Sequence, residues 1–206
     1  MSRLEDTRQK ALADLGESGV LMRDGHFDYG NGYHGSVYLN PHQFFRHPST
    51  IWRFAQDLLD VLPATIVGLT EVVAGPVTGG ALLAHTMAGL LDSRRSLTHP
   101  SCCFAPFHIA RSGGFLLRSF YGRELEGKRI LLVDDVRNTG QTLAQCAALV
   151  KEAGGDVIAT AVIYDRGKPL VPFDLPNHAL AEYQAPENYP VNVCPLCKSG
   201  VPITSF

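Results

Sequence analysis

The chain has 206 residues, of which 45% are apolar and 18% are charged, a profile typical of a folded globular protein rather than a disordered one. The formal net charge of -2 leaves no global basic field, which argues against a dedicated nucleic-acid-binding protein. The N-terminus has no apolar signal-peptide core, and no run approaches the roughly 18 apolar residues of a membrane span. We therefore expect a cytoplasmic protein without a membrane partner.

The first part of the chain is expected to contain two helices separated by a β-rich segment. Residues 3–16 repeat apolar side chains on one helical face, which predicts an amphipathic helix. Residues from about 18 to 42 contain short alternating runs separated by glycine and asparagine, a pattern typical of a β-hairpin or a small hood. A second helix is predicted from about 49 to 62, ending at Pro63.

From residue 71 onward, apolar strands alternate with helical patterns. The predicted strands are 71–76, 102–107, 114–120, 129–135 and 156–166, and the predicted helices are 79–91 and 140–153. This alternation is typical of an α/β fold with a parallel sheet covered on both faces, and the strand at 114–120 would form a hairpin arm. The tail, about 168–206, is expected to be irregular and to wrap the core, so that residues 1–206 form one domain.

The stretch "ILLVDDVRNTGQT" carries the strongest chemical signal. Asp134 and Asp135 directly follow four apolar residues, so they fall at the carboxyl end of a predicted central strand, where ligands of parallel sheets bind. A helix is predicted to begin near Thr139, and its free N–H groups with the flexible Gly140 suit a phosphate monoester. The two carboxylates suit vicinal hydroxyls or a hydrated cation. Together they suggest a ribose 5-phosphate, although the acids could also simply cap the helix and face water.

This stretch resembles the phosphoribosyl-pyrophosphate (PRPP) motif of type I phosphoribosyltransferases. The resemblance implies a twisted parallel sheet flanked by helices, with a small N-terminal hood and a β-hairpin loop. It also implies that Asp134 and Asp135 hold the ribose hydroxyls. Mg²⁺ would be bound through the substrate, with the two acids as its candidate protein ligands. The turn that would wrap the 5-phosphate consists of Arg137, Asn138, Thr139, Gly140, Gln141 and Thr142.

Other segments are similar to the orotate phosphoribosyltransferase branch of that family. "GHFDYGNGYHGSVYLNP" resembles its hood, and "VVAGPVTGGALLA" resembles its pyrophosphate loop, which implies PRPP contacts for Val77, Thr78 and Gly79. The alternative for the glycine is a tight strand-to-helix turn without a ligand. "AGGDVIATAVIYDR" resembles the strand that ends in a base-binding arginine, here Arg166; the alternative is a pair with Asp165 or a surface charge. The remaining candidate base-binding residues are Asn138, Tyr38 and Leu39.

The region 105–125 corresponds to a mobile cationic loop that, in the family, closes over the pyrophosphate, usually in the neighbouring subunit of a homodimer. It contains no lysine here. Its candidate catalytic cations are Arg118, His108 and Arg111. The alternative is a solvated hairpin with ordinary surface charges.

The resemblance implies a pentosyltransferase that moves ribose 5-phosphate from PRPP to a nucleobase and releases pyrophosphate, with orotate as the favoured base and pyrimidine nucleotide biosynthesis as the setting. Two alternatives stay open: a transferase for another base, and a non-catalytic PRPP-binding regulator. The regulator would have kept the ligand motif and lost the cationic loop.

The motif "CPLC" places Cys194 and Cys197 two residues apart. Such a pair can be structural thiols, half of a metal site or a redox pair. A structural zinc would need two further ligands, for which the sequence offers Cys102, Cys103 or a histidine such as His99. The structural interpretation is favoured because "CPLCKSGVPI" resembles the C-terminal segment of the orotate branch, but metal binding stays open.

Overall fold

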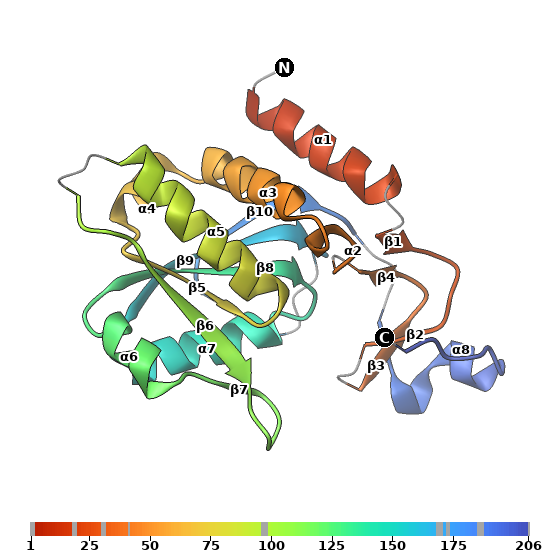
Figure 1. Cartoon of the computed structure of the whole chain (residues 1–206). Helices are drawn as coiled ribbons and strands as arrows, with labels where there is room; N and C mark the ends of the chain where they lie inside the picture. Colours follow the sequence, from red (N-terminus) through yellow and green to blue (C-terminus); the bar gives the residue numbers. More distant parts are fainter. Residues whose placement is uncertain are drawn as a thin grey trace.

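The computed structural model describes residues 3–17, 20–29, 32–40, 42–95, 99–167, 171, 174–184 and 188–205. Its main unit is a six-stranded sheet in the order β10-β9-β8-β5-β6-β7, in which neighbouring strands are parallel except for the antiparallel pair β6–β7 (Figure 1). The strands are β5 (Val72–Pro76), β6 (Cys103–Ile109), β7 (Phe115–Leu116), β8 (Arg129–Arg137), β9 (Asp156–Asp165) and β10 (Asn177–Glu182).

The strand order reverses between β5 and β8. From β5 the chain moves outward to β6 on one side, whereas β8, β9 and β10 follow one another toward the other edge. The connections that leave the carboxyl ends of β5 and β8 therefore diverge, and a crevice opens between them. This is the position at which the sequence predicted a ligand.

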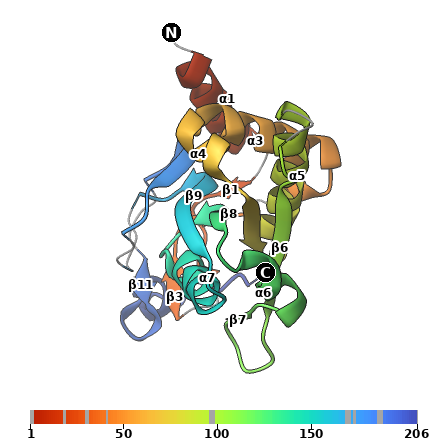
Figure 2. The same ribbon diagram turned by 90° about the vertical axis from the view of Figure 1, so that its left-hand side faces the viewer.

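Helices cover both faces of the sheet, and alternate residues of each strand contact the two layers. Leu131 and Val133 of β8 belong to the core shared with α1, α3 and α5, whereas Ile130 and Leu132 belong to the core shared with α6 and α7. Figure 2 shows the two helical layers on opposite sides of the strands. The helices are α1 (Arg3–Glu17), α2 (His42–Phe45), α3 (Pro48–Val61), α4 (Ala64–Leu69), α5 (Gly79–Arg94), α6 (Ser119–Leu125) and α7 (Gln141–Glu152).

The predicted hood is a pair of small sheets beside the main sheet (Figure 1). One pairs β1 (Leu21–Met22) with β4 (Tyr38–Leu39). The other has the order β11-β3-β2 and joins β2 (Phe27–Asp28) and β3 (Tyr33–Gly35) to β11 (Tyr189–Pro190) from the tail. The 3-10 helix η1 (Val191–Val193) and α8 (Pro195–Lys198) follow β11. The C-terminal segment is thus part of the hood.

The predicted fold class is confirmed, but two local predictions were wrong. The strand expected at 114–120 is only β7, because α6 begins at Ser119 and buries Leu125 against the sheet. The tail is not irregular throughout, since β10 adds a parallel edge strand whose residues 179–181 are buried. Residues 168–170, 172–173 and 185–187 of the tail lie outside the described part. The short helix α4 was not predicted.

Among the described residues, no helix is both long enough and apolar enough to cross a membrane.

Candidate active site

The two adjacent acids, Asp134 and Asp135, face two different cavities. They lie within β8, which continues past them to Arg137, so consecutive side chains point to opposite faces of the sheet. Asp134 lines the cavity formed with the turn before α7, and Asp135 lines the cavity formed with the hood. The sequence predicted that the strand ends at the acids, but β8 ends two residues later, at Arg137. Because the acids are still within the strand, their side chains point to opposite faces and lie between the two cavities.

The cavity on the turn side, called here the turn cavity, has a volume of about 190 Å³. Gly140 has a left-handed backbone with φ of 84° directly before α7, a conformation that suits glycine. Thr139 is buried, and its Oγ1 accepts a hydrogen bond from the N–H of Gln141 at 3.3 Å. The first turn of α7 therefore adjoins a small polar cavity, an arrangement that favours anions. The lining residues are Tyr29, Asp134, Val136, Arg137, Asn138, Thr139, Gly140, Thr142 and Leu143.

Arg137 has a structural partner as well as a place in this cavity. Its Nη2 donates to Asp165 Oδ2 at the end of β9. Its Nε is buried and has no hydrogen-bond acceptor among the described residues. A buried donor without an acceptor is costly, so this atom is a candidate contact for an anion in the turn cavity.

The second cavity, called here the hood cavity, has a volume of about 180 Å³ and adjoins the first, because Tyr29, Val136 and Asn138 line both. The structure brings all four predicted base-binding residues together in it. The lining residues are Tyr29, Tyr38, Leu39, Asp135, Val136, Asn138 and Arg166.

Arg166 is buried, with 5% of its surface exposed, so it is not a surface charge. Its guanidinium lies over the ring of Tyr29, 5.1 Å from the centroid. Asp165 instead accepts from Arg137 and, at 2.9 Å, from Asn177 Nδ2. Neither alternative raised for Arg166 therefore matches the described contacts, and the side chain is available to the hood cavity.

The acid pair is electrostatically strained. Burial raises the pKa of Asp134 well above its usual range, and the neighbouring charge of Asp135 adds to the effect. The N–H of Asp135 donates to Asp134 Oδ1 at 2.9 Å and favours the charged form only in part. Burial also raises the pKa of Tyr38, and the nearby charge of Asp135 raises it further. A ligand that brings hydroxyl donors or a cation to these carboxylates would relieve this repulsion.

The predicted pyrophosphate loop connects β5 to α5 and lies against the acids. Its Val77–Thr78 peptide bond is cis. A Cβ at Gly79 would overlap Asp135 Oδ2, and a Cβ at Gly80 would lie 2.9 Å from Asp134 Oδ1. A side chain at either position would collide with a carboxylate. Glycine is therefore needed here both for the tight turn and for the close approach of the loop to the acids. The loop and the acid pair thus form one site.

The structure does not bring the predicted catalytic cations to the two cavities. His108 lies on β6, Arg111 in the hairpin turn, and Arg118 directly before α6, and none of them lines either cavity. Arg111 and Arg118 are exposed, and the hairpin β6–β7 projects beyond the sheet as an arm (Figure 1). His108 Nε2 is buried without a hydrogen-bond partner among the described residues. Within one chain, the hairpin does not complete the site.

The residues that sequence reasoning missed include Tyr29 and Asn188. Tyr29 lines both cavities, and its only sequence signal is its place in the alternating hood segment. Asn188 donates through Nδ2 to Asn138 Oδ1 at 3.2 Å and so holds the turn from the tail. The sequence gives no signal for this contact, because the two residues are 50 positions apart.

Comparisons with known proteins show which proteins this chain resembles. A model of the phosphoribosyl transferase domain matches residues 50–176. The chain is 31% identical over 198 residues to a protein named orotate phosphoribosyltransferase from Caulobacter vibrioides, and the match covers 96% of this chain and 94% of that protein.

Two solved structures show the same fold. Orotate phosphoribosyltransferase from Aeropyrum pernix superposes with a TM-score of 0.63 at 22% identity, covering 84% of this chain and 92% of the other. Orotate phosphoribosyltransferase from Mycobacterium tuberculosis H37Rv in complex with PRPP superposes with a TM-score of 0.55 at 18% identity, covering 86% of this chain and 89% of the other.

Proposed function

The chain belongs to the phosphoribosyl transferase domain family, and from this premise we propose that it transfers ribose 5-phosphate from PRPP to orotate and releases pyrophosphate. This reaction belongs to pyrimidine nucleotide biosynthesis. The curated relative named above, matched over nearly its full length, carries the name of this activity.

One observation carries the proposal: the acid pair separates two adjoining cavities at the switch point of the sheet. A ribose between the cavities would direct its 5-phosphate into the turn cavity, beside the N-terminus of α7 and Arg137 Nε. Its C1 side would face the hood cavity and the loop at Gly79. The carboxylates of Asp134 and Asp135 are then within reach of the ribose hydroxyls.

The hood cavity favours a carboxylated base. Among the described residues that line it, Arg166 is the one cation. An arginine binds a carboxylate through two parallel hydrogen bonds, and orotate carries a carboxylate whereas uracil, adenine and hypoxanthine do not. The stacked pair of Tyr29 and Tyr38, with ring centroids 6.3 Å apart, gives this cavity an aromatic wall suited to a planar ring.

The residues of this chain would act by position and charge. The bond between C1 and pyrophosphate breaks while a nitrogen of the base approaches C1, so positive charge develops on the ribose ring. The turn and the loop hold the two ends of PRPP, and the cavities orient the base toward C1. Because the transition state is an oxocarbenium-like sugar, orientation and electrostatic stabilisation account for the rate.

Magnesium fits the donor set of the site, because carboxylate oxygens of Asp134 and Asp135 and substrate oxygens are the ligands that a hard divalent cation prefers. When bound, it would offset negative charge on the pyrophosphate. In the absence of a cation, the raised pKa of Asp134 limits the negative charge that the pair can carry. We propose that Mg²⁺ is bound mainly through PRPP, with the acid pair as its candidate protein ligands.

The hairpin suggests a homodimer in which each arm serves the neighbouring site. His108 and Arg111 lie on this arm, Arg118 follows it directly before α6, and all three are outside both cavities of their own chain. A second subunit could present the same arm to this pyrophosphate loop. We further propose that the chain acts in the cytoplasm as one domain, with the hood and the tail as its subregions, and without a nucleic-acid or membrane partner.

A pyrophosphate-release assay tests the proposal. The enzyme is given PRPP, Mg²⁺ and, separately, orotate, uracil, hypoxanthine or adenine. Turnover with orotate alone supports the assignment, and turnover with another base identifies a different transferase. Calorimetric binding of PRPP without turnover on any base would replace the enzyme with a PRPP-binding regulator.

A further inference from the structure

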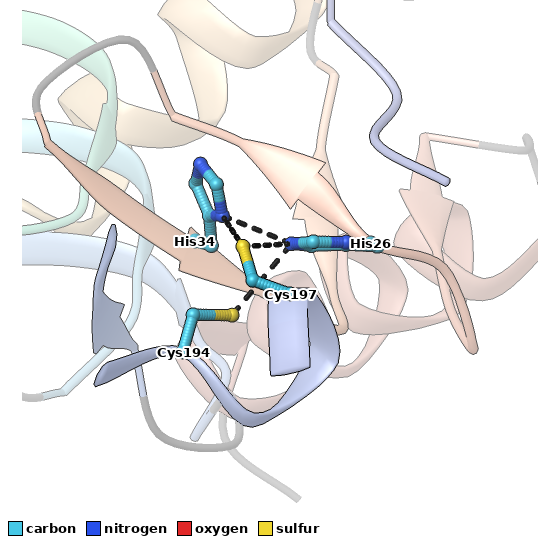
Figure 3. A group of neighbouring side chains, drawn as sticks. All are labelled: His26, His34, Cys194 and Cys197. Atoms are coloured by element: carbon cyan, nitrogen blue, oxygen red, sulfur yellow. Dashed lines mark hydrogen bonds between the residues drawn. The ribbon is translucent and has the colours of Figure 1, made fainter. Parts of the chain in front are cut away.

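Four potential metal ligands meet where the tail packs on the hood, outside both cavities. Figure 3 shows His26 and His34 from the hood directed toward Cys194 and Cys197 from the tail. Their ligand atoms all lie within 4.8 Å of one another. The other candidates from the sequence, Cys102, Cys103 and His99, do not belong to this group.

The spacing of these atoms matches a tetrahedral ion. The distance from His26 Nε2 to His34 Nδ1 is 2.9 Å. His26 Nε2 lies 3.6 Å from each of the two sulfurs, and Cys197 Sγ lies 3.3 Å from His34 Nδ1. Around zinc, bond lengths of about 2.0–2.1 Å to nitrogen and about 2.3 Å to sulfur give separations of about 3.4 Å between nitrogens and about 3.5 Å between nitrogen and sulfur. Because the ligand atoms are separated by up to 4.8 Å, shifts of up to about one ångström would close the cluster around the ion.

Hydrogen bonding alone does not explain the convergence. His26 Nδ1 lies 2.7 Å from the backbone oxygen of Val201, so this nitrogen carries the proton and Nε2 offers one lone pair. Three groups approach that single lone pair: His34 Nδ1 and the two sulfurs. A cation at the centre would bind the lone pairs of all four ligands at once.

The surroundings of the histidines are those of metal ligands. The contact to Val201 fixes the ring of His26 through its other nitrogen, as hydrogen-bond acceptors do for metal-bound histidines. His34 presents its other nitrogen toward Asp28, whose Oδ1 is 3.9 Å from Nε2. His26, His34 and Cys194 are 1%, 3% and 1% exposed, and Cys197 is partly exposed.

We propose that His26, His34, Cys194 and Cys197 form a structural Zn²⁺ site that joins the tail to the hood. Two imidazoles and two thiolates in a tetrahedral arrangement select zinc over Mg²⁺ or Ca²⁺, which prefer oxygen ligands. Four protein ligands leave no open coordination position, so the ion has a structural rather than a catalytic role.

The site would stabilise contacts that are weak by themselves. β11 pairs with β3 through only two residues, Tyr189 and Pro190. Two backbone hydrogen bonds involve Thr204, which accepts from the N–H of Asp28 at 3.1 Å and donates to the carbonyl of His26 at 2.7 Å. Strands this short are marginal alone, whereas the binding energy of a metal adds directly to folding. Zinc would therefore hold the tail on the hood segment that carries Tyr29 and Tyr38, two residues that line the hood cavity.

Metal content tests the site independently of enzymatic activity. The untagged protein, expressed with zinc in the medium, should contain one zinc per chain by elemental analysis. Cys197→Ser should lose this zinc, whereas the matched control Cys103→Ser, altered at a thiol on β6, should keep it. Replacement of zinc by Co²⁺ in the wild type should give the visible absorption bands of a tetrahedral thiolate site.

Hydrogen exchange then tests the structural role. Removal of zinc should speed amide exchange in residues 21–39 and 189–204 and leave β8 and β9 protected. Wild-type protein that is folded yet holds neither zinc nor cobalt would overturn the proposal. So would an intact mass showing that Cys194 and Cys197 form a disulfide, because oxidised sulfurs cannot both bind as thiolates.

Discussion

Arg166, at the end of the sheet, lies over the ring of Tyr29 in the hood, and its Nη2 is 3.5 Å from the Tyr29 hydroxyl. Tyr29 in turn donates from its hydroxyl to the carbonyl of Val37 at 2.6 Å. The position of the arginine in the hood cavity thus depends on a contact between two parts of the molecule. A base that binds to Arg166 would therefore depend on both the sheet and the hood being in place.

Arg166→Ala should weaken use of orotate and leave PRPP binding nearly unchanged. A hydrogen bond to a charged group contributes about 1.5–3 kcal/mol, so KM for orotate should rise about 10- to 100-fold. Steady-state kinetics measures the first effect, and calorimetry with PRPP measures the second. The control Tyr29→Phe keeps the aromatic ring and should cost less. Equal losses for orotate and PRPP would contradict a role at the base.

The double substitution Asp134→Asn with Asp135→Asn should abolish measurable PRPP binding without unfolding the protein. Asparagine has the same shape and keeps the Oδ1 acceptor for the N–H of Asp135, but it cannot supply the negative charge that hydroxyls and Mg²⁺ require. Calorimetry with PRPP and Mg²⁺ measures the affinity, and circular dichroism checks the fold. Unchanged affinity in the double variant would rule out the ribose assignment.

Asp134→Asn alone should stabilise the protein without ligand at neutral pH. Because burial raises the folded-state pKa above the ordinary value of 3.8, the folded state binds the proton more tightly than the unfolded state. The wild type therefore loses stability as pH rises from that value through the folded pKa. The variant lacks this loss, and its advantage should reach about 1–3 kcal/mol, the cost of a buried uncompensated group.

Denaturant unfolding of both proteins between about pH 5 and about pH 8 measures this difference. The gain should shrink toward the acidic end, because the wild type regains stability as pH falls through the raised pKa of Asp134. A variant that is less stable at every pH would show that the charge of Asp134 supports the fold and does not oppose it.

The fold and the acid pair were predictable from local patterns, because a run such as "ILLV" followed by two acids and a turn is written in consecutive residues. The division of the acids between two cavities was not, since it depends on β8 continuing to Arg137. The edge strand β10 was hidden by the prolines around its short apolar run at 179–181. His26 and His34 have no metal-binding spacing of their own and meet the CxxC pair only because the tail folds back onto the hood.

Gly79→Ala should impair PRPP use far more than a comparable change elsewhere in α5. A Cβ at Gly79 would overlap Asp135 Oδ2 and crowd Phe45, and overpacking of this kind costs about 1–3 kcal/mol. The matched control is Gly89→Ala in the same helix, where a Cβ meets no atom within 4 Å, so this change should stabilise the helix by about 0.5–1 kcal/mol. Thermal unfolding and kcat/KM for PRPP measure both effects. Similar kinetics for the two variants would show that Gly79 serves only the turn.

Mixing two inactive variants should restore activity if the hairpin of one subunit serves the other. Arg118→Ala removes a candidate cation that directly follows the arm, whereas Asp135→Asn removes a carboxylate proposed to bind the ribose hydroxyls. A mixed dimer has one site with both defects and one site with none, so random exchange of subunits should recover about a quarter of the wild-type sites.

The measurement is pyrophosphate release after the two variants are unfolded and refolded together, compared with each variant refolded alone. Recovery is expected because Arg118 lies outside both cavities of its own chain. No recovery, with mixed dimers shown by mass spectrometry, would place the arm over the site of its own subunit. Full activity of Arg118→Ala alone would instead remove this arginine from the reaction.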